Sequence, residues 1–431
     1  MPSLAGPNHL FTPAEAVAPM ELMPAYHDIR TVIETKGGPL TFAEFMQISL
    51  YGQHGFYASG NVELNATGGS DFITTVEASP FLGIAITNWL QDRQPAVHPH
   101  HFSIVEPGAG SGIMARTILD EIGARYPKLA AVDYTIVELA PGMIRRQQEI
   151  LRGYPVQWVN GSATSLPLRN IKGAIISDEL PDAFPVHWMV RRGDSSGEIY
   201  INLTKEGCFY ELEGPVSSER LAQLTTETIR RYQVEDGEYF TINPLANKCI
   251  QDTLGALAIG SSALIVDYGY PEGWRPPPRN EVIRYFSRLG DKSRRLRGVD
   301  RQVSYQWPGK VDMTSDVDFG ALTAIARSNG AIVDFAGTQA EFMEAYGNDA
   351  AYDRVMEALK RGERSPGGVF EKRFAGYMRY MEGEWQNDYR PTLDEYARIQ
   401  TDGWGMYERG KPITESLVVV AYTKRSDQLD A

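Results

Sequence analysis

The sequence predicts an α/β protein with a doubly wound, seven-stranded and mostly parallel sheet. Short apolar runs rich in isoleucine and valine alternate with helical segments from residue 102 onward. Such nearly continuous runs are typical of strands that are buried on both faces of a parallel sheet. A glycine-rich loop follows the first run and opens a helix, as ligand-binding turns of this fold class do.

Four predicted strands come early in the chain and three come late. They are Phe102–Glu106, Tyr134–Glu138, Val156–Asn160, Ala174–Ser177, Ala263–Tyr268, Ala331–Phe335 and Leu417–Thr423. Predicted helices over Ile113–Arg125 and Pro141–Arg152 connect the first three strands into a βαβ series. We expect the last two strands, which a long helical stretch separates, to form a terminal hairpin.

The remaining segments are predicted to surround this core. Residues 1–95 read as mostly helical and are expected to cover the active site; within them Thr41 and Glu44 have the spacing of a capping box. The other predicted segments are the first half of the core over 96–214, a helical insertion over 215–258, the rest of the core over 259–338 with an irregular insertion over 271–318, a helical insertion over 339–412, and the last core strand and tail over 413–431. A loop as long as 271–318 is usually functional or mobile.

Composition restricts the class of partner. The chain has 431 residues, a formal net charge of −13 and two cysteines, Cys208 and Cys249. This charge disfavours nucleic acid as a partner, since phosphate binding needs basic residues, and it is compatible with a cationic substrate. Two cysteines are too few for a disulfide framework or a cysteine metal site, and we expect no metal. No membrane span or secretion signal is seen, so a cytoplasmic location is expected, and the insertions allow a homodimer.

The loop Glu106–Gly112 reads Glu-Pro-Gly-Ala-Gly-Ser-Gly. Gly108, Gly110 and Gly112 let the backbone turn sharply and approach a ligand without Cβ clashes. Dinucleotide-binding loops usually read G-x-G-x-x-G, and here the third glycine comes one residue early. S-adenosylmethionine carries a sulfonium and an ammonium instead of a pyrophosphate, so the acidic Glu106 beside the loop favours this cofactor. A tight turn without a ligand is the alternative.

Two further turns are expected to complete the cofactor site. Glu138 ends the second strand, where a carboxylate can accept hydrogen bonds from both ribose hydroxyls, and Leu139 follows it. Ser162 and Ala163 come after the third strand and are expected to flank the adenine. The ribose interaction alone fits S-adenosylmethionine and NAD equally. The glycine spacing favours S-adenosylmethionine.

An acidic loop follows the fourth strand, at the sheet edge where open α/β proteins bind substrates. Asp178, Glu179 and Asp182 lie within five residues of one another and repel each other unless a cation or donors compensate. A guanidinium is an apt partner because it is planar, always charged and pairs bidentately with carboxylates. His187 is a candidate general base. The alternatives are an exposed acidic turn and a structural histidine.

An ordered set of motifs resembles the MidA family of S-adenosylmethionine-dependent methyltransferases, which includes the mitochondrial complex I assembly methyltransferase. The motifs run through most of the chain. They are Gly38–Met46, Leu50–Gly52, Gly55–Tyr57, Asp71–Glu77, Glu106–Gly112, Tyr134–Pro141, Ser177–His187, Val266–Gly269, Asp312–Phe319 and Gly337–Gln339.

The resemblance implies a class I methyltransferase core and methylation of an arginine nitrogen on a protein. It also implies pocket residues outside the glycine loop. Thr74 and Thr75 are assigned to the cofactor, and the residues assigned to the substrate are Tyr51, Tyr57, Glu77, Asp267 and Tyr268.

Several positions depart from the family pattern. They are Val76 for proline, Pro107 for leucine or glycine, Asp178 for asparagine, Pro181 for an aromatic or aliphatic residue, and Arg284–Arg288 for a histidine-rich segment. These departures lead us to expect that the acceptor has drifted, toward free arginine or another small guanidine.

The sequence therefore predicts an S-adenosylmethionine-dependent N-methyltransferase that acts on a guanidino nitrogen of free arginine, a related small guanidine or protein arginine. The alternatives are a small-molecule O- or N-methyltransferase with a non-guanidine acceptor, a methyltransferase-like assembly factor without turnover, and an NAD-dependent oxidoreductase. Three other signals are interpreted as structural: the histidines of 98–101, the basic run 288–301 and the aromatic residues between 377 and 389.

Overall fold

The computed structural model describes a defined part of the chain. The described residues are 22–58, 74–78, 80–97, 101–126, 129, 132–274, 282–287, 296–297, 301–347, 357, 407–408, 411–412 and 417–425. The histidines of 98–100, most of the basic run 288–301, the aromatic residues of 377–389 and most of the predicted insertion 339–412 lie outside them. The chain divides into two compact units: unit 1 comprises residues 1–62, 181–246 and 273–317, and unit 2 comprises residues 63–180, 247–272 and 318–431.

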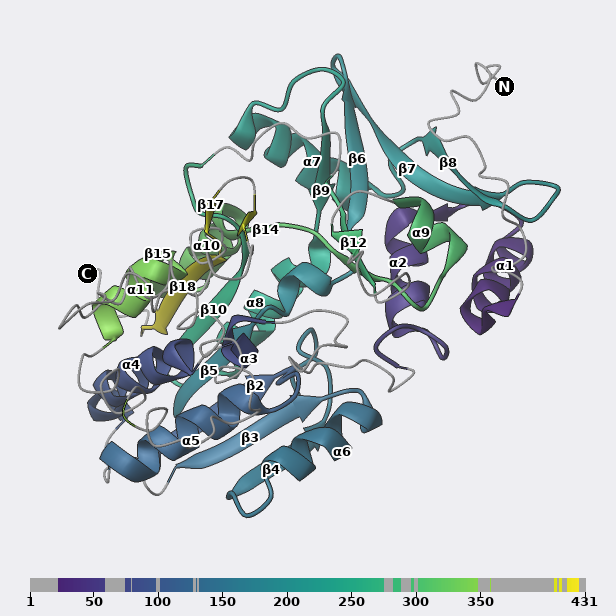
Figure 1. Ribbon diagram of the computed structural model, residues 1–431. Coiled ribbons are helices and arrows are strands. Elements are labelled where there is room, and N and C mark those ends of the chain that lie inside the picture. Colours follow the sequence, from purple (N-terminus) through teal and green to yellow (C-terminus); the bar gives the residue numbers. More distant parts are fainter. Residues whose placement is uncertain are drawn as a thin grey trace, which may run out of the picture. The chain divides into compact units, whose positions relative to one another are not determined.

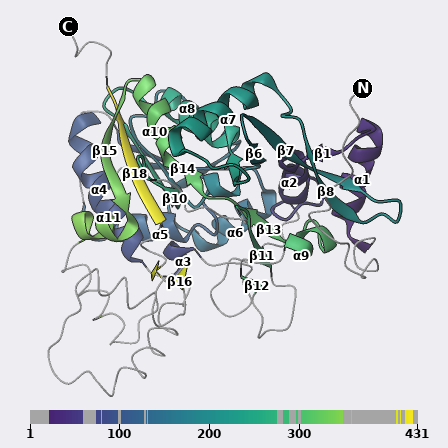
Figure 2. The same cartoon turned by 90° about the horizontal axis from the view of Figure 1, so that it is seen from above.

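Unit 2 contains a mostly parallel sheet in the strand order β15-β18-β10-β5-β2-β3-β4 (Figure 1). Its strands are β2 (Ser103–Pro107), β3 (Asp133–Glu138), β4 (Val156–Asn160), β5 (Gly173–Asp178), β10 (Ser262–Tyr270), β15 (Ala331–Thr338) and β18 (Leu417–Lys424). Among these seven, only β18 runs against its neighbours, pairing antiparallel with both β10 and β15. An eighth short strand, β14 (Val317–Asp318), pairs with β10. All seven predicted strands are present, and the predicted terminal hairpin is confirmed by the pairing of β15 with β18 (Figure 2).

The helices of unit 2 contact this sheet or one another. They are α3 (Thr75–Ala78), α4 (Phe81–Val97), α5 (Ile113–Arg125), α6 (Pro141–Ile150), α10 (Phe319–Ser328) and α11 (Gln339–Tyr346), with α8 (Pro244–Ala256) at the boundary of the units. The core includes Trp89 of α4, Ile118 of α5, Tyr134 of β3 and Val419 of β18, all fully buried. No helix in the described parts of the chain combines the length and apolar character needed to cross a membrane.

Unit 1 contains a separate antiparallel sheet in the order β1-β7-β6-β9, with β8 paired to β7. Its elements are β1 (Leu40–Thr41), β6 (His187–Arg192), β7 (Ser195–Leu203), β8 (Phe209–Gly214), β9 (Tyr239–Ile242), α1 (Pro24–Lys36), α2 (Phe42–Tyr51) and α7 (Glu219–Tyr232). Phe45 of α2 packs edge-on against Phe209 of β8 and Tyr305.

This antiparallel sheet corrects the predicted organisation. Strands β6 to β8 lie in the segment 96–214, which the sequence assigned to the parallel core, and β9 interrupts the helical insertion 215–258. These strands escaped prediction because β7 carries polar residues along much of its length, whereas the prediction relied on continuous apolar runs.

The segment 271–318 is also more regular than predicted. It contains β11 (Arg284–Ser287), β12 (Leu296–Arg297), α9 (Arg301–Gln306), β13 (Asp312–Thr314) and the start of β14 (Val317–Asp318). Strand β11 pairs antiparallel with both β12 and β13. A short hairpin of β16 (Tyr407–Glu408) and β17 (Lys411–Pro412) precedes β18.

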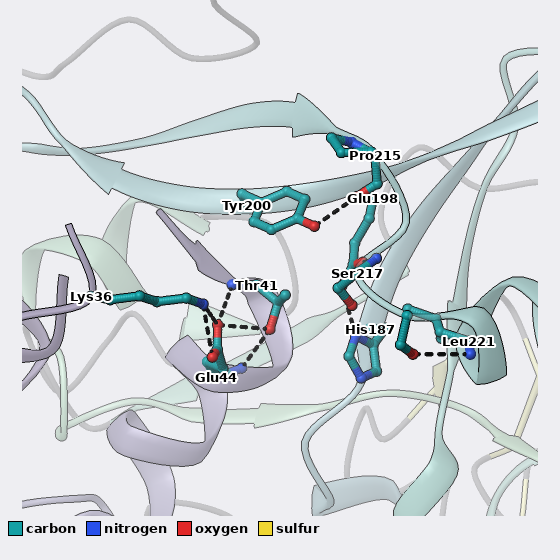
Figure 3. Close-up of polar contacts among 10 residues, drawn as sticks. Lys36, Thr41, Glu44, His187, Glu198, Tyr200, Pro215, Ser217 and Leu221 are labelled. Atoms are coloured by element: carbon teal, nitrogen blue, oxygen red, sulfur yellow. Dashed lines mark hydrogen bonds and ion pairs between the residues drawn. The ribbon is translucent and has the colours of Figure 1, made fainter. Parts of the chain in front are cut away.

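The predicted capping box at the start of α2 is confirmed (Figure 3). The Thr41 hydroxyl accepts a hydrogen bond from the Glu44 backbone N–H at 3.1 Å, and the Glu44 carboxylate accepts one from the Thr41 N–H at 2.8 Å. Lys36 pairs with the same carboxylate at 2.6 Å, which ties the end of α1 to the start of α2. The sequence thus specifies this helix start locally.

We expect Thr41→Ala to lower the free energy of unfolding by about 1 kcal/mol, because the Glu44 backbone N–H loses the hydroxyl oxygen that caps it. Urea unfolding followed by far-UV circular dichroism measures this change. Thr226→Ala is the control: Thr226 is an exposed threonine inside α7 that bonds back to the Ala222 carbonyl. Equal effects of the two substitutions would contradict the capping role.

Candidate active site

The glycine loop follows β2 and presents bare backbone at the carboxyl edge of the unit 2 sheet. Gly108, Gly110 and Gly112 have φ angles of +68°, +52° and +88°, a region that residues with a Cβ atom rarely adopt. A Cβ atom on Gly108 would lie 2.8 Å from Cδ1 of Leu180. The conformation therefore requires glycine, and it leaves backbone groups open to close approach by a ligand.

Glu106 lies beneath this loop with its carboxylate in the core. The Tyr134 hydroxyl donates a hydrogen bond to Glu106 Oε2 at 2.6 Å, and both side chains are buried. Burial raises the pKa of Glu106 to about 7; the Tyr134 bond opposes this rise, and the charge of Glu138 adds to it. The expected role of Glu106 toward the cofactor stays a prediction.

Glu138 occupies the predicted position at the end of β3. Its Oε1 accepts hydrogen bonds from the backbone N–H groups of Leu139 and Ala140 at 2.8 and 2.9 Å. Burial raises the pKa of Glu138. The two backbone hydrogen bonds, and a further one from the Gln147 amide, oppose this rise. The carboxylate is thus fixed in direction by its own turn, as a ribose-binding group would need to be.

Gln147 of α6 is a residue that sequence reasoning missed. Its Nε2 donates to Glu138 Oε2 at 3.1 Å and to the Gly110 carbonyl at 2.9 Å, while the Trp158 indole donates to its Oε1. It is fully buried and joins the glycine loop to the turn after β3. Nothing in the sequence marks this glutamine, because its partners lie 37 and 9 residues away.

The residues predicted to flank the adenine lie in the adjacent turns of unit 2. Leu139 is 54% exposed, which is unusual for a large apolar side chain beside a buried carboxylate. Ser162 follows β4, where its hydroxyl bonds Thr164 at 2.9 Å, and Ala163 is largely buried. Their contacts with a nucleoside stay predictions.

Glu179 is held in a left-handed conformation directly after β5. Its φ is +47°, a strained value for a non-glycine residue, and its N–H donates to the Val266 carbonyl of β10 at 2.8 Å. Its Oε1 accepts a hydrogen bond from the Thr75 N–H at 3.1 Å, and the Thr75 hydroxyl donates to Gln339 at 3.1 Å. The loop after β5 is thereby joined to α3 and α11. Strain that the surroundings hold in place is common at functional sites.

Several buried polar atoms at this end of unit 2 have no hydrogen-bond partner among the described residues. They are Thr74 Oγ1, both carboxylate oxygens of Glu77 and Ser177 Oγ. Buried polar groups are normally hydrogen-bonded, so unpaired ones of this kind are typical of a ligand-binding site. Together with the glycine loop, these atoms fit a polar, cationic cofactor.

Two further predicted residues lie in β10, which pairs with β5. Asp267 is fully buried, and its Oδ1 accepts the N–H of Tyr268 at 2.7 Å. Asp178 ends β5 opposite Val266. Unit 2 thus brings Asp178, Glu179, Asp267 and Tyr268 to one sheet edge.

Asp182 belongs to unit 1, where a guanidinium of the same chain accompanies it. Arg284 Nη2 lies 3.6 Å from Asp182 Oδ2, and Nη1 lies 3.3 Å from Asp316 Oδ1. Arg284 Nε donates to the Thr314 hydroxyl at 3.2 Å. The guanidinium beside Asp182 is therefore an internal one, and binding of a substrate guanidinium by the acidic loop stays a prediction. Sequence reasoning noted Arg284 only as a departure from the family pattern.

Tyr51 and Tyr57 also lie in unit 1, with their rings stacked 5.3 Å apart. The Tyr51 hydroxyl donates to the Ala183 carbonyl at 2.9 Å, and the Tyr57 hydroxyl donates to Asp312 at 2.8 Å. Burial, together with the charge of Asp312, raises the pKa of Tyr57 well above its usual value. Tyr57 is therefore a neutral hydrogen-bond donor at physiological pH.

His187 opens β6 and is oriented by a buried carboxylate (Figure 3). Its Nδ1 lies 2.6 Å from Glu198 Oε1, while Glu198 Oε2 accepts the Ser217 N–H at 2.7 Å. Glu198 is fully buried and His187 is 22% exposed through its side chain. The pair fits both a positioned base and a structural link between β6 and β7, so the catalytic role of His187 stays a prediction.

A solved structure with the same fold contains a cofactor product. A crystal structure from Burkholderia thailandensis with bound S-adenosyl-homocysteine superposes with a TM-score of 0.70 at 20% identity, covering 96% of this chain and 95% of that one. The fold is that of a class I S-adenosylmethionine-dependent methyltransferase.

The family assignment follows from the sequence comparisons. A family model described as "Putative S-adenosyl-L-methionine-dependent methyltransferase" matches residues 81–337, more than half of the chain. The chain belongs to this family and is an S-adenosylmethionine-dependent methyltransferase. The MidA resemblance predicted from its motifs is confirmed.

Curated relatives match over most of their length. The protein arginine methyltransferase NDUFAF7 homolog, mitochondrial, of Caenorhabditis elegans is 25% identical over 350 residues, covering 75% of this chain and 76% of the relative. The protein arginine methyltransferase NDUFAF7, mitochondrial, of Danio rerio is 25% identical over 373 residues, covering 76% and 82%.

These names contradict the expected cytoplasmic location, because the relatives are mitochondrial proteins. The expectation rested on the two cysteines and on the lack of a recognised secretion signal. Neither feature specifies a compartment, which is why the inference was wrong.

We expect Gly110→Val to abolish binding of S-adenosylmethionine, because a β-branched residue is strained at a φ of +52° and its side chain obstructs the loop. Isothermal titration calorimetry measures the affinity. Gly193→Val is the matched control: Gly193 has a φ of +56° in the β6–β7 turn, and a Cβ atom there meets nothing within 4 Å. Retained affinity in Gly110→Val would contradict the loop assignment.

We expect Arg284→Met to lower the free energy of unfolding by about 3 kcal/mol, because it leaves buried Asp182 without its counter-ion. Arg327→Met removes a comparable ion pair with Glu272, but both partners are about half exposed, so its cost should stay below about 1 kcal/mol. Urea unfolding compares the two variants. Similar losses would show that Arg284 is not a buried counter-ion.

Proposed function

We propose that this methyltransferase transfers the methyl group to a guanidino nitrogen of arginine, either within a protein or as free arginine or a related small guanidine. The fixed carboxylate of Glu179 is the observation that carries the proposal. Relatives whose names state protein arginine methylation support the same acceptor chemistry.

The position of Glu179 supports an acceptor-binding role. Strands β2 and β5 are parallel neighbours, so the glycine loop after β2 and Glu179 after β5 leave the same edge of the sheet. Ligands of open α/β proteins bind in the crevice at this edge. The Thr75 N–H and the Val266 carbonyl fix both the side chain and the backbone of Glu179, which reduces the reorganisation needed during the reaction.

The chemistry of a guanidinium requires a carboxylate. A protonated guanidinium is a poor nucleophile because its electrons are delocalised over three nitrogens. When bound, the cofactor supplies an electrophilic methyl group on sulfur. The Glu179 carboxylate would localise the acceptor's positive charge on two nitrogens and leave the third more nucleophilic. As the N–C bond forms and the C–S bond breaks, Glu179 would accept the released proton.

The internal ion pair of Arg284 refines the roles of the other carboxylates. It supports the view that this acidic loop suits a guanidinium, yet it also balances the charge of Asp182. We therefore assign the proton-accepting role to Glu179 rather than to Asp182. Asp178 keeps a supporting role in the proposal, whereas the roles predicted for His187 and Tyr57 of unit 1 stay predictions.

The net charge of the chain indicates which class of partner it binds. The net charge of −13 supports a cationic acceptor and disfavours nucleic acid, and we propose no membrane partner. A homodimer stays a prediction, and light scattering on the purified protein tests it.

We expect Glu179→Gln to reduce kcat at least about 100-fold while the Kd for S-adenosylmethionine changes less than about twofold. Glutamine keeps an oxygen for the Thr75 N–H but removes the charge and the proton acceptor. Methyl transfer from labelled S-adenosylmethionine and titration calorimetry measure the two quantities. Unchanged turnover would remove Glu179 from the mechanism.

The acceptor is tested separately with the unmodified protein. We expect label to enter free arginine or arginine-containing peptides, with mass spectrometry locating the methyl group on a guanidino nitrogen. Phenols and lysine peptides serve as controls. Labelling of a phenol without labelling of any guanidine would overturn the proposed acceptor while leaving the methyltransferase assignment intact.

A further inference from the structure

A buried carboxylate beside the glycine loop has no role in the function proposed above. Glu77 lies in α3 and is 4% exposed, and neither of its carboxylate oxygens has a hydrogen-bond partner within the described residues. Helix α3 packs against α4 and α5, and α5 begins directly after Gly112. The Ser111 hydroxyl and the Thr74 backbone amide lie close enough to lower the pKa of Glu77, but neither makes a hydrogen bond of normal geometry with it, so both oxygens can still accept a donor from a ligand.

The surroundings of Glu77 define what kind of donor fits. Ser111 of the glycine loop is nearby, and Arg146 of α6 acts on Glu77 from a longer range. Among the described residues, further carboxyl groups lie at this end of unit 2: Glu179, whose oxygen accepts the Thr75 N–H, and the edge residues Glu106 and Glu138. These carboxyl groups favour a positively charged donor here.

We propose that Glu77 is the counter-ion of the α-ammonium group of S-adenosylmethionine, and that it takes up this role by releasing a proton when the cofactor binds. An ammonium has three N–H groups and can satisfy both carboxylate oxygens. The sulfonium has no N–H to donate, so it cannot. This inference assigns to the cofactor a residue that the sequence analysis had assigned to the substrate, although the family resemblance places it in the cofactor or the substrate pocket. It rests on the cofactor and not on the identity of the acceptor.

Proton release predicts in which direction the affinity for the cofactor changes with pH. Burial raises the pKa of Glu77 to about 7, and Ser111, Arg146 and the Thr74 backbone amide partly oppose this rise. Below pH 7 the free protein therefore holds a neutral carboxyl group. Binding of a cation favours the ionised form and lowers the pKa, so affinity must rise as pH increases toward 7 and level off above it.

Three ligands that differ in charge distinguish a contact with the ammonium group from a contact with the sulfonium group. S-adenosylmethionine carries both cationic groups, S-adenosylhomocysteine keeps the ammonium alone, and 5′-methylthioadenosine has neither. Between pH 5.5 and 7.5 an α-amino group, whose pKa is about 7.7–8.0, stays mostly protonated, so titration calorimetry in this range reports mainly on the protein. We expect the first two ligands to bind at least about tenfold more tightly at pH 7.5 than at pH 5.5 and the third to bind equally at both.

Titrations in buffers with different ionisation enthalpies measure how many protons are released when a ligand binds. At pH 6 we expect release of about one proton with the two charged ligands and none with 5′-methylthioadenosine. In Glu77→Gln the release should disappear, and both charged ligands should bind about 10- to 100-fold more weakly at pH 7.5, because a charge-assisted hydrogen bond is lost. Affinity for 5′-methylthioadenosine should be unchanged, which also shows that the variant is folded.

Two control variants exclude other sources of the effect. Glu149→Gln removes the same charge from an exposed position on α6 and should behave as the unmodified protein. Glu106 also has a pKa raised to about 7, so Glu106→Gln should keep the proton release if Glu77 is its source. Loss of release in Glu106→Gln alone would overturn the proposal.

The affinities in Glu77→Gln decide the remaining alternatives. Equal weakening of all three ligands would indicate a structural role, and weakening of S-adenosylmethionine alone would place Glu77 at the sulfonium. Unchanged binding of every ligand would remove Glu77 from the cofactor site. Each of these results overturns the proposal, whereas none bears on whether the acceptor is a guanidine.

Discussion

The parallel pairing of β2 with β5 is the constraint on which the site depends. Both strands end at the same edge, so the loop after β2 and the acidic turn after β5 are brought together by backbone hydrogen bonds rather than by side-chain contacts. The pairing of β5 with β10 extends the arrangement, because Val266 of β10 supplies the carbonyl that fixes the Glu179 backbone. Residues that are far apart in sequence therefore meet without any specific recognition between their side chains.

This edge is unfavourable for the isolated protein. It contains the strained backbone of Glu179, the buried carboxyl groups of Glu77 and Glu106, and the hydroxyls of Thr74 and Ser177, which find no hydrogen-bond partner among the residues that the structure describes. Each of these features destabilises the folded chain, and the apolar core around Trp89 and Tyr134 must compensate. A ligand that is polar and cationic would relieve most of them at once. The features that destabilise the folded chain thus also favour a polar, cationic ligand over other ligands.

Much of the core was predictable because its signals are local. The seven strands of the sheet are apolar runs, the Thr41 capping box spans three residues, and the positive φ angles of Gly108 to Gly112 follow from the glycine spacing. The antiparallel sheet was not predictable by the same reasoning, because strands such as β7 carry many polar residues.

The partners of the site residues were the hardest to foresee. Asp182 finds Arg284 about a hundred positions along the chain, and Gln147 reaches both Glu138 and Gly110. Contacts of this kind depend on how the elements pack, which no periodicity in the sequence records. Burial of a carboxylate, as at Glu77, is likewise a property of the folded unit and not of the residue type.

The position of β18 has a consequence for synthesis on the ribosome. This strand follows all the others in the chain, yet it lies between β10 and β15, and β15 has no other strand partner within the described sheet. While translation proceeds toward residue 417, β15 and one side of β10 expose unpaired backbone groups to the solvent and to other nascent chains. The sheet can therefore be completed only after residues 417–424 have been synthesised, and until then its unpaired strand edges can associate with other exposed strands.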